Sequence, residues 1–294
     1  MSKIVITTDS GLDPINQDTM ISGQITRDNI DNFRDVKEIS NRRILEELKE
    51  HTFKTSSPIM GDYYDMFEKH LEEGNDIIHL CMSSGISEGS VNAPNMVAND
   101  LMDEYENKIY IVDTLNATTG GTLINEYAKE LVEKGMSVEE IIEELNRFKK
   151  YVQTSFYVPN PEGFIKSGRD KSSMCAKDKA LLLGAKATKL AGIKFRVDFN
   201  DEGNLYVKNM MRVKTSLGML KMLKEIVNES NIESYDPAYV VIGNILEKDV
   251  SMDELIDYLN SFKYFNNVIR QDINGVVACY GSEDLCGISL IKKP

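Results

Sequence analysis

Hydroxyl side chains gather in four short segments in the first half of the chain, each beside a predicted strand or helix. These segments are Thr7-Thr8-Asp9-Ser10, Thr55-Ser56-Ser57-Pro58, Ser83-Ser84-Gly85-Ile86-Ser87, and Asp113-Thr114 with Thr118-Thr119-Gly120-Gly121. Hydroxyls donate hydrogen bonds without carrying charge, and the N–H groups at a helix start do the same. Together the segments would make a neutral cradle for an anion. Each segment alone is more typical of a helix cap than of a binding loop, and even four of them together do not name a ligand.

Groups that could activate a nucleophile are scarce. The chain has three histidines. His51 and His70 lie in charged helical stretches and are expected on the surface, whereas His79 lies in an apolar strand and is expected in the core. Motifs of nucleotide-binding loops, α/β-hydrolases and zinc proteases are missing from the sequence. A hydrolase or transferase that uses Asp9 and the hydroxyl loops therefore ranks last among the candidate functions.

One basic segment, from Glu162 to Asp170, could also contribute to a site. Within it, Arg169 could reach an interdomain cleft and pair with a ligand carboxylate or with Asp9. An arginine in a surface turn is an equally good interpretation. The sequence leaves both open.

The elements that would position these residues alternate in the first half, as in a parallel sheet covered by helices. Strands are predicted over 3–8, 76–82 and 108–113, and helices over 44–51, 59–73, 91–105, 119–134 and 138–150. Ser57-Pro58 is predicted to start the second helix, Gly135 to end the fourth, and Ser137 with Glu140 to form a capping box.

The second half has more strands for each helix. Strands are predicted over 193–199, 204–208, 239–242, 267–272 and 275–279, and helices over 176–193, 216–227 and 252–262. We therefore expect an α/β protein of two domains, 1–152 with a mostly parallel sheet and 153–294 with a mixed sheet. A chain of 294 residues is about right for two domains with a cleft between them.

Composition limits the partners. The 47 acidic and 34 basic residues give a net charge of −13, which argues against nucleic acid and anionic lipid surfaces as partners. The sequence contains no apolar run long enough for stable membrane insertion. Four scattered cysteines lack the spacing of a zinc site. We expect a cytoplasmic protein with reduced thiols and no metal or cofactor.

Taken together, the motifs resemble the DegV family of bacterial fatty-acid-binding proteins over nearly the whole chain. The ordered set carries the resemblance: TDSGLD at 8–13, TSSP at 55–58, MSSGIS at 82–87, IYIVDTLNATTGG at 109–121, FIKSGR at 164–169, GIKFRV at 192–197, MMRVKT at 210–215 and INGVVACYGSEDLCGISL at 273–290.

The resemblance implies a protein that binds one long-chain fatty acid in an apolar tunnel between its domains, without catalysis of its own. The family's carboxylate-binding hydroxyls fall on Thr55 and Ser87. The expected ligand-binding residues are Thr55, Ser87, Ser56, Ser84, Asp9, Ser10, Thr119, Gly120, Arg169 and Tyr280. The alternative that the family implies is the acyl-carrying subunit of a bacterial fatty acid kinase, which presents the fatty acid for phosphorylation.

The sequence departs from the family pattern near its end, where the family has H-x-G-P-G. Tyr280 stands at the histidine position and Ser282-Glu283-Asp284 at the G-P-G positions. Tyrosine can donate a hydrogen bond to a carboxylate but does not carry a proton near neutral pH as histidine does. The departure is therefore expected to affect transfer to a kinase more than lipid binding.

Overall fold

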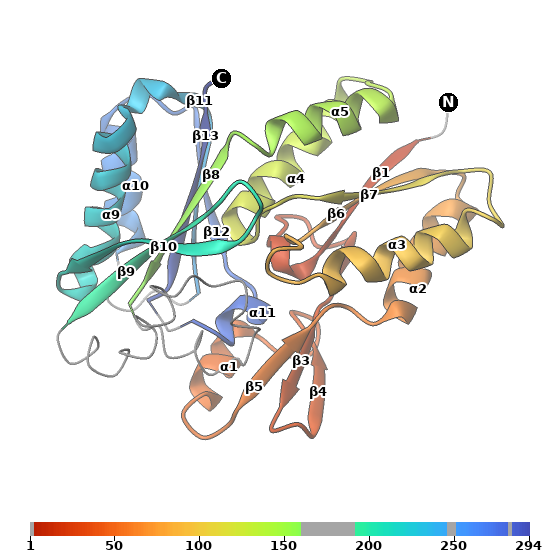
Figure 1. Cartoon of the computed structure of the whole chain (residues 1–294), viewed down its shortest axis with the longest axis horizontal. Coiled ribbons are helices and arrows are strands. Elements are labelled where there is room, and N and C mark those ends of the chain that lie inside the picture. The colour runs from red at the N-terminus through yellow and green to blue at the C-terminus, as the bar shows by residue number, and fades with distance from the viewer. Residues whose placement is uncertain (1–2, 160–191, 246–250, 282–283) are drawn as a thin grey trace.

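The computed structural model describes residues 3–159, 192–245, 251–281 and 284–294. Its elements form three sheets with helical layers beside and between them (Figure 1). The expectation for Arg169 lies outside the described residues, as does nearly all of the helix predicted over 176–193.

A four-stranded parallel sheet forms the centre of the first half. Its strands, in the order β2-β1-β6-β7, are β1 (Ile4–Asp9), β2 (Met20–Ile21), β6 (Asp76–Cys81) and β7 (Ile109–Asp113). One face is covered by α2 (Met60–Glu72) and α3 (Gly89–Leu101), and the other by α4 (Thr118–Glu133) and α5 (Val138–Phe148). The parallel sheet predicted for this half is confirmed.

A six-stranded mixed sheet forms the centre of the second half. Its strands, in the order β10-β9-β8-β13-β11-β12, are β8 (Val152–Val158), β9 (Ile193–Phe199), β10 (Leu205–Arg212), β11 (Tyr235–Asn244), β12 (Asn267–Asp272) and β13 (Cys286–Lys292). Only the β11–β12 pair is parallel. The outer face is covered by α9 (Thr215–Ser230) and α10 (Met252–Ser261). The short helix η2 (Ile232–Ser234) joins α9 to β11. The mixed sheet is as predicted, and β13, the last strand of the chain, lies in its interior.

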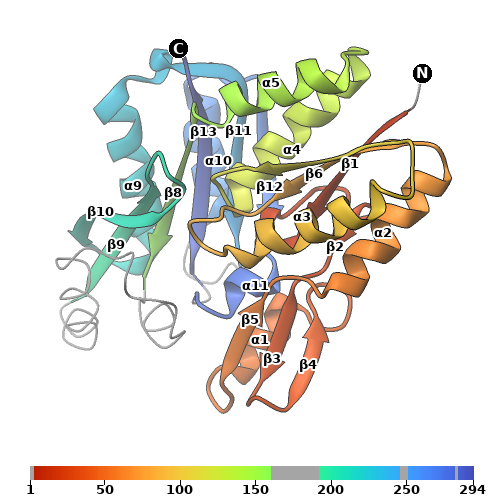
Figure 2. The same ribbon diagram turned by 45° about the vertical axis from the view of Figure 1, so that its right-hand side comes forward.

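Helices α4 and α5 lie between the two large sheets (Figures 1 and 2). Buried Leu123 and Ile124 of α4 belong to one hydrophobic cluster with Ile78 of β6 and Val241 of β11. The two halves therefore share a core through α4. The boundary near residue 152 stays a prediction, and the first strand of the mixed sheet begins there.

A third, smaller sheet was not predicted. Its antiparallel strands, in the order β4-β3-β5, are β3 (Gln24–Arg27), β4 (Asp31–Arg34) and β5 (Phe53–Ser56). It packs against α1 (Asn41–Glu47) and α11 (Gly275–Ala278) through the buried side chains of Ile25, Ile39, Ile44, Phe53, Val276, Cys279 and Tyr280. The sheet thus joins residues near both ends of the chain.

Three local predictions were wrong. Residues 275–279 form α11 and not a strand, because the buried Asp35 carboxylate accepts hydrogen bonds from Gly275 N and Val276 N at 2.9 and 3.2 Å and so caps a helix start. Ser57-Pro58 does not begin α2, whose N-cap is Ile59. His70 is buried in α2, since it lies on the face of the helix that meets the sheet.

Other local predictions hold. Gly135, with φ of 74°, follows the end of α4. Ser137 and Glu140 form the predicted capping box of α5. His79 is fully buried and its Nδ1 lies 2.9 Å from Thr7 Oγ1. His51 is half-buried and contacts Asp28. None of the described helices is both long and apolar enough to cross a membrane.

Candidate functional site

A cavity opens at the carboxyl ends of the parallel strands, where the three sheets approach one another. It encloses about 940 Å³ of empty space, including the part that is open to solvent. Its polar lining residues are Asp9, Ser10, Thr55, Ser56, Ser57, Ser87, Ser90, Thr118 and Tyr280. The rest is largely apolar and includes Met82, Ile86, Phe156, Val197, Phe199, Leu205, Val276, Val277 and Leu285. The cavity therefore suits a molecule with a small polar end and an apolar body.

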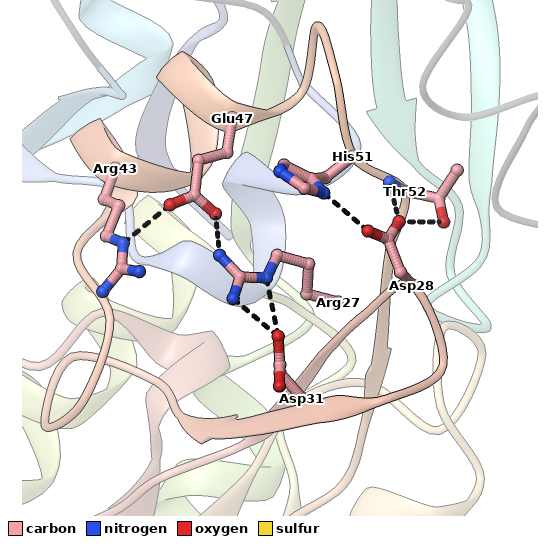
Figure 3. Close-up of polar contacts among 7 residues, drawn as sticks. All are labelled: Arg27, Asp28, Asp31, Arg43, Glu47, His51 and Thr52. Carbon is pink, nitrogen blue, oxygen red and sulfur yellow. Dashed lines mark hydrogen bonds and ion pairs between the residues drawn. The ribbon is translucent and has the colours of Figure 1, made fainter.

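Thr55 is positioned by the small sheet. It lies on β5, where Ile25 of β3 is its partner across the ladder. Ion pairs fix this region: Arg27 contacts Asp31 at 2.6 Å and Glu47 of α1 at 2.7 Å, while Arg43 contacts Glu47 at 2.8 Å (Figure 3). These contacts join α1 to the β3–β4 hairpin, whose strand β3 pairs with β5.

A second group in Figure 3 fixes the start of β5. Asp28 accepts hydrogen bonds from Thr52 N at 2.8 Å and Thr52 Oγ1 at 3.0 Å, and its other oxygen lies 2.5 Å from His51 Nδ1. The Thr52 N–H first, and then His51, hold the pKa of Asp28 down at about 2. Asp28 is therefore ionised at neutral pH and keeps these contacts.

Tyr280 meets Thr55 in the lining of the cavity. The two hydroxyls are in hydrogen-bond contact, and the Tyr280 hydroxyl also accepts a hydrogen bond from Thr55 N at 3.2 Å. Tyr280 follows α11, whose start is held by the first half: Asp35 binds Gly275 N, and Asp13 accepts a hydrogen bond from Asn274 N at 2.9 Å. Tyr280 is thus placed beside Thr55 by two buried carboxylates from the opposite end of the chain.

Ser57 and Ser87 are a second pair of hydroxyl residues that meet in the lining of the cavity. Their hydroxyl oxygens lie 3.3 Å apart. The start of α3 approaches them so closely that a Cβ on Gly89 would lie 2.6 Å from Ser57 Oγ. A larger residue at position 89 would therefore force the Ser57 hydroxyl away from its place beside Ser87.

Asp9 is the only acidic or basic residue among the described residues that line the cavity. Its carboxylate is 2% exposed and accepts hydrogen bonds from Gly11 N at 3.1 Å and Met82 N at 3.0 Å. Burial raises its pKa to about 7, although these two bonds act in the opposite direction. Around neutral pH the hydroxyls that line the cavity are neutral, and burial makes Asp9 far easier to protonate than an ordinary aspartic acid.

Six of the ten expected binding residues line the cavity: Asp9, Ser10, Thr55, Ser56, Ser87 and Tyr280. Three others lie elsewhere. Ser84 donates a hydrogen bond to Asp113 at 2.5 Å, Thr119 Oγ1 lies 2.7 Å from Ser289 Oγ, and a Cβ on Gly120 would meet Asn116 Oδ1 at 2.1 Å. Thr119 and Gly120 face the mixed sheet and are not among the described residues that line the cavity, so ligand binding by them stays a prediction. The tenth, Arg169, lies outside the described residues.

The sequence did not single out Thr118 and Ser90, or the apolar wall from the second half. Thr118 stood in the same hydroxyl-rich segment as Thr119, and the backbone conformation at the start of α4 decides which of the two faces the cavity. Phe156, Phe199 and Leu285 come from strands and loops far apart in the sequence. Only the tertiary structure brings them together.

The fold and the cavity define a class of α/β protein with an internal cavity lined by both hydroxyl groups and apolar side chains. The DegV family model, described as "Uncharacterised protein, DegV family", matches residues 3–293. The chain therefore belongs to the DegV family, and the resemblance noted in the sequence is confirmed.

Individual relatives agree with this assignment. A DegV domain-containing protein of Clostridium acetobutylicum is 25% identical over 257 residues, which are 87% of this chain and 85% of the relative. A DegV family protein from Eubacterium eligens, solved loaded with heptadecanoic acid, has a TM-score of 0.83 at 17% identity and covers 99% of this chain and 100% of its own. The Fatty Acid Kinase (Fak) B3 protein of Streptococcus pneumoniae, loaded with linoleic acid, has a TM-score of 0.81 at 19% identity, with 100% of both chains covered. At these identities the two structures establish the fold.

Proposed function

We propose that this protein binds one long-chain fatty acid, with its carboxylate held by Thr55 and Ser87 and its acyl chain against the apolar wall of the cavity. The observation that carries the proposal is one cavity whose lining combines hydroxyl groups, two pairs of which meet, with many apolar side chains. Similar structures that were solved with heptadecanoic and linoleic acids support it.

The physical argument concerns the cost of burying a carboxylate. A carboxylate that leaves water must be hydrogen-bonded, and neutral hydroxyls supply donors without a second buried charge. Thr55, Ser57 and Ser87 supply such donors in the lining of the cavity. Each buried CH₂ group contributes about 0.8 kcal/mol, so most of the affinity comes from the acyl chain. The hydroxyls then fix which end of the lipid enters.

The proposal includes no catalysis by this chain. His79 cannot serve as a general base at the cavity, because it is buried, contacts Thr7, and has a pKa lowered to about 3 by burial. The Asp9 carboxylate is held by two backbone N–H groups, and no hydroxyl among the described residues donates a hydrogen bond to it. We keep the absence of a cofactor and a cytoplasmic location as predictions.

Lipid extraction is the direct test. The purified protein is denatured and extracted with organic solvent, and fatty acid is sought by mass spectrometry; delipidated protein is then titrated with oleate and palmitate. We expect a bound fatty acid and saturable uptake. Recovery of no fatty acid together with no saturable uptake would refute the proposal.

Substitutions test the assignment of the carboxylate site. Thr55→Val and Ser87→Ala each remove one donor to a charged group, so each should weaken oleate binding about 10-fold. Ser84→Ala is the matched control, because the Ser84 hydroxyl is bonded to Asp113 and does not line the cavity. Equal affinities for Ser84→Ala and Ser87→Ala would contradict the assignment.

A second candidate function is the acyl-carrying subunit of a fatty acid kinase. It is favoured by the likeness to the Streptococcus pneumoniae Fak B3 protein over the whole of both chains. Tyr280, at the position of the family histidine, weighs against it because a phenol does not carry a proton near neutral pH. Acyl-phosphate formation by the cognate kinase in the presence of the loaded protein would support this candidate.

A further inference from the structure

Thr118 has a hydroxyl group that the described part of the protein leaves without a hydrogen bond. The residue begins α4, is 1% exposed and lines the cavity, and its Oγ1 has no partner among the described residues. The neighbouring threonines of α4 differ in this respect. Thr119 Oγ1 lies 2.7 Å from Ser289 Oγ, and Thr122 donates to the carbonyl of Asp13 at 2.8 Å.

The backbone at Thr118 is strained as well. Its φ of 49° places a β-branched residue in the left-handed region, which such residues rarely adopt. A glycine would remove that strain, and a valine would remove the unbonded buried hydroxyl. Both features destabilise the free protein, and their combination at a cavity wall indicates a role in binding.

The position of Thr118 specifies the chemical class of its partner. It stands at the N-terminus of a helix of 16 residues, where the helix dipole favours a negative charge. Ser10 and Asp9 line the cavity with it. A fatty acid carries its polar atoms only in the carboxylate, so that group is the one part of the ligand that can bond to the Thr118 hydroxyl.

We propose that Thr118 is a third hydroxyl ligand of the fatty acid carboxylate, in addition to Thr55 and Ser87. The inference rests on the proposed function. It makes Thr118 the residue through which α4, the helix shared by both halves, contacts the ligand. Loading of the cavity would satisfy the hydroxyl that the free protein leaves unbonded.

The test compares two adjacent threonines on delipidated full-length protein. Thr118→Val keeps the shape and the β-branch but removes the hydroxyl, and it should weaken oleate binding about 10-fold, as for one hydrogen bond to a charged group. Its denaturation midpoint without ligand should equal or exceed that of the wild type, because no bond made in the free protein is lost. Thr118→Ser keeps the hydroxyl and should bind close to the wild-type affinity.

Thr119→Val gives the opposite pattern and serves as the matched control. It breaks the buried contact with Ser289, so the midpoint should fall while oleate affinity changes little. The fold-loss of affinity caused by Thr118→Val should be the same for decanoate, myristate and oleate, because the three acids share the carboxylate and differ in chain length. A fold-loss that grows with chain length would contradict a contact at the carboxylate.

The outcomes separate this inference from the proposed function. Oleate binding by the wild type together with undiminished binding by Thr118→Val would overturn the role of Thr118 alone. A lowered midpoint of Thr118→Val without a change in affinity would overturn it too, since the hydroxyl would then be structural. Failure of the wild type to bind any of the three acids would overturn the proposed function and this inference with it.

Discussion

Asp9 should make the stability of the ligand-free protein depend on pH in a predictable direction. Burial raises its pKa from 3.8 to about 7 in the folded protein. Between these values the folded protein holds a proton that the unfolded chain has released, so the free energy of unfolding falls as the pH rises. The Asp9 contribution is complete below pH 3.8 and is gone above about pH 7. The free energy of unfolding of the wild type should therefore fall from pH 5 to pH 7, and Asp9→Asn should remove the part of this fall that comes from Asp9.

The magnitude follows from the same interval. At about 1.4 kcal/mol per pH unit, the whole interval corresponds to about 4 kcal/mol, and the step from pH 5 to pH 7 to about 2 kcal/mol, because the loss levels off as the pH reaches the folded-state pKa. Asp9→Asn also replaces one of the two acceptors for Gly11 N and Met82 N, which costs about 1–3 kcal/mol at every pH. The readout is therefore the change of the wild-type minus variant difference with pH, and not its value at one pH.

The assay is urea unfolding of delipidated protein at pH 5, 6, 7 and 8. The buried Asp35, whose pKa burial raises to about 6, titrates in both proteins and cancels in the difference. Asp31→Asn, at an exposed residue paired with Arg27, is the control and should leave the pH profile unchanged. If the difference between wild type and Asp9→Asn stays constant over this range, or grows in favour of the wild type as pH rises, the account of Asp9 is wrong.

Two further predictions concern Tyr280 and Arg196. Tyr280→Phe removes the hydroxyl that contacts Thr55. It should weaken oleate binding to delipidated protein about 5-fold, which corresponds to the loss of one hydrogen bond of ~1 kcal/mol. An unchanged affinity in the oleate titration would show that Tyr280 does not help to hold Thr55. Arg196 is 1% exposed and pairs with Asp198 at 2.9 Å. Arg196→Ala would leave the buried Asp198 carboxylate unpaired, so it should lower the free energy of unfolding by about 3–5 kcal/mol. Urea unfolding measures this loss, and a decrease below 1 kcal/mol would mean that Asp198 finds another partner or becomes protonated.

The parallel sheet could be predicted because its strands are continuous apolar runs. Ile77 and Ile78 are buried on opposite faces of β6, as expected for a strand covered by helices on both sides. The small sheet lacks that signal, since Asp31 and Asn32 of β4 are exposed. Its strands form because Ile25 and Phe53 pack against α1 and α11, a contact between distant parts of the chain. Local sequence does not encode such a contact.

In the candidate site, too, some residues could be predicted from local sequence and others depend on tertiary packing. Thr55, Ser87 and Tyr280 could be proposed from the order of motifs, and all three line the cavity. Thr118 and Thr119 could not be told apart, because one residue on a helix turns the side chain by about 100° and only packing sets the starting angle. Residues 275–279 read as a strand since they contain two valines, but a distant carboxylate, Asp35, caps them as a helix.

The interior position of β13 affects the order in which the protein becomes functional during synthesis. Domains generally fold from the N-terminus as the chain leaves the ribosome, but here the mixed sheet lacks its strand between β8 and β11 until residues 286–292 emerge. Tyr280 and Leu285 of the cavity wall come just before that strand. A nascent chain therefore has no finished cavity until these residues have been synthesised and have paired with β8 and β11. Such non-local pairing also slows folding, which leaves the apolar wall exposed for longer than in a protein built from local contacts.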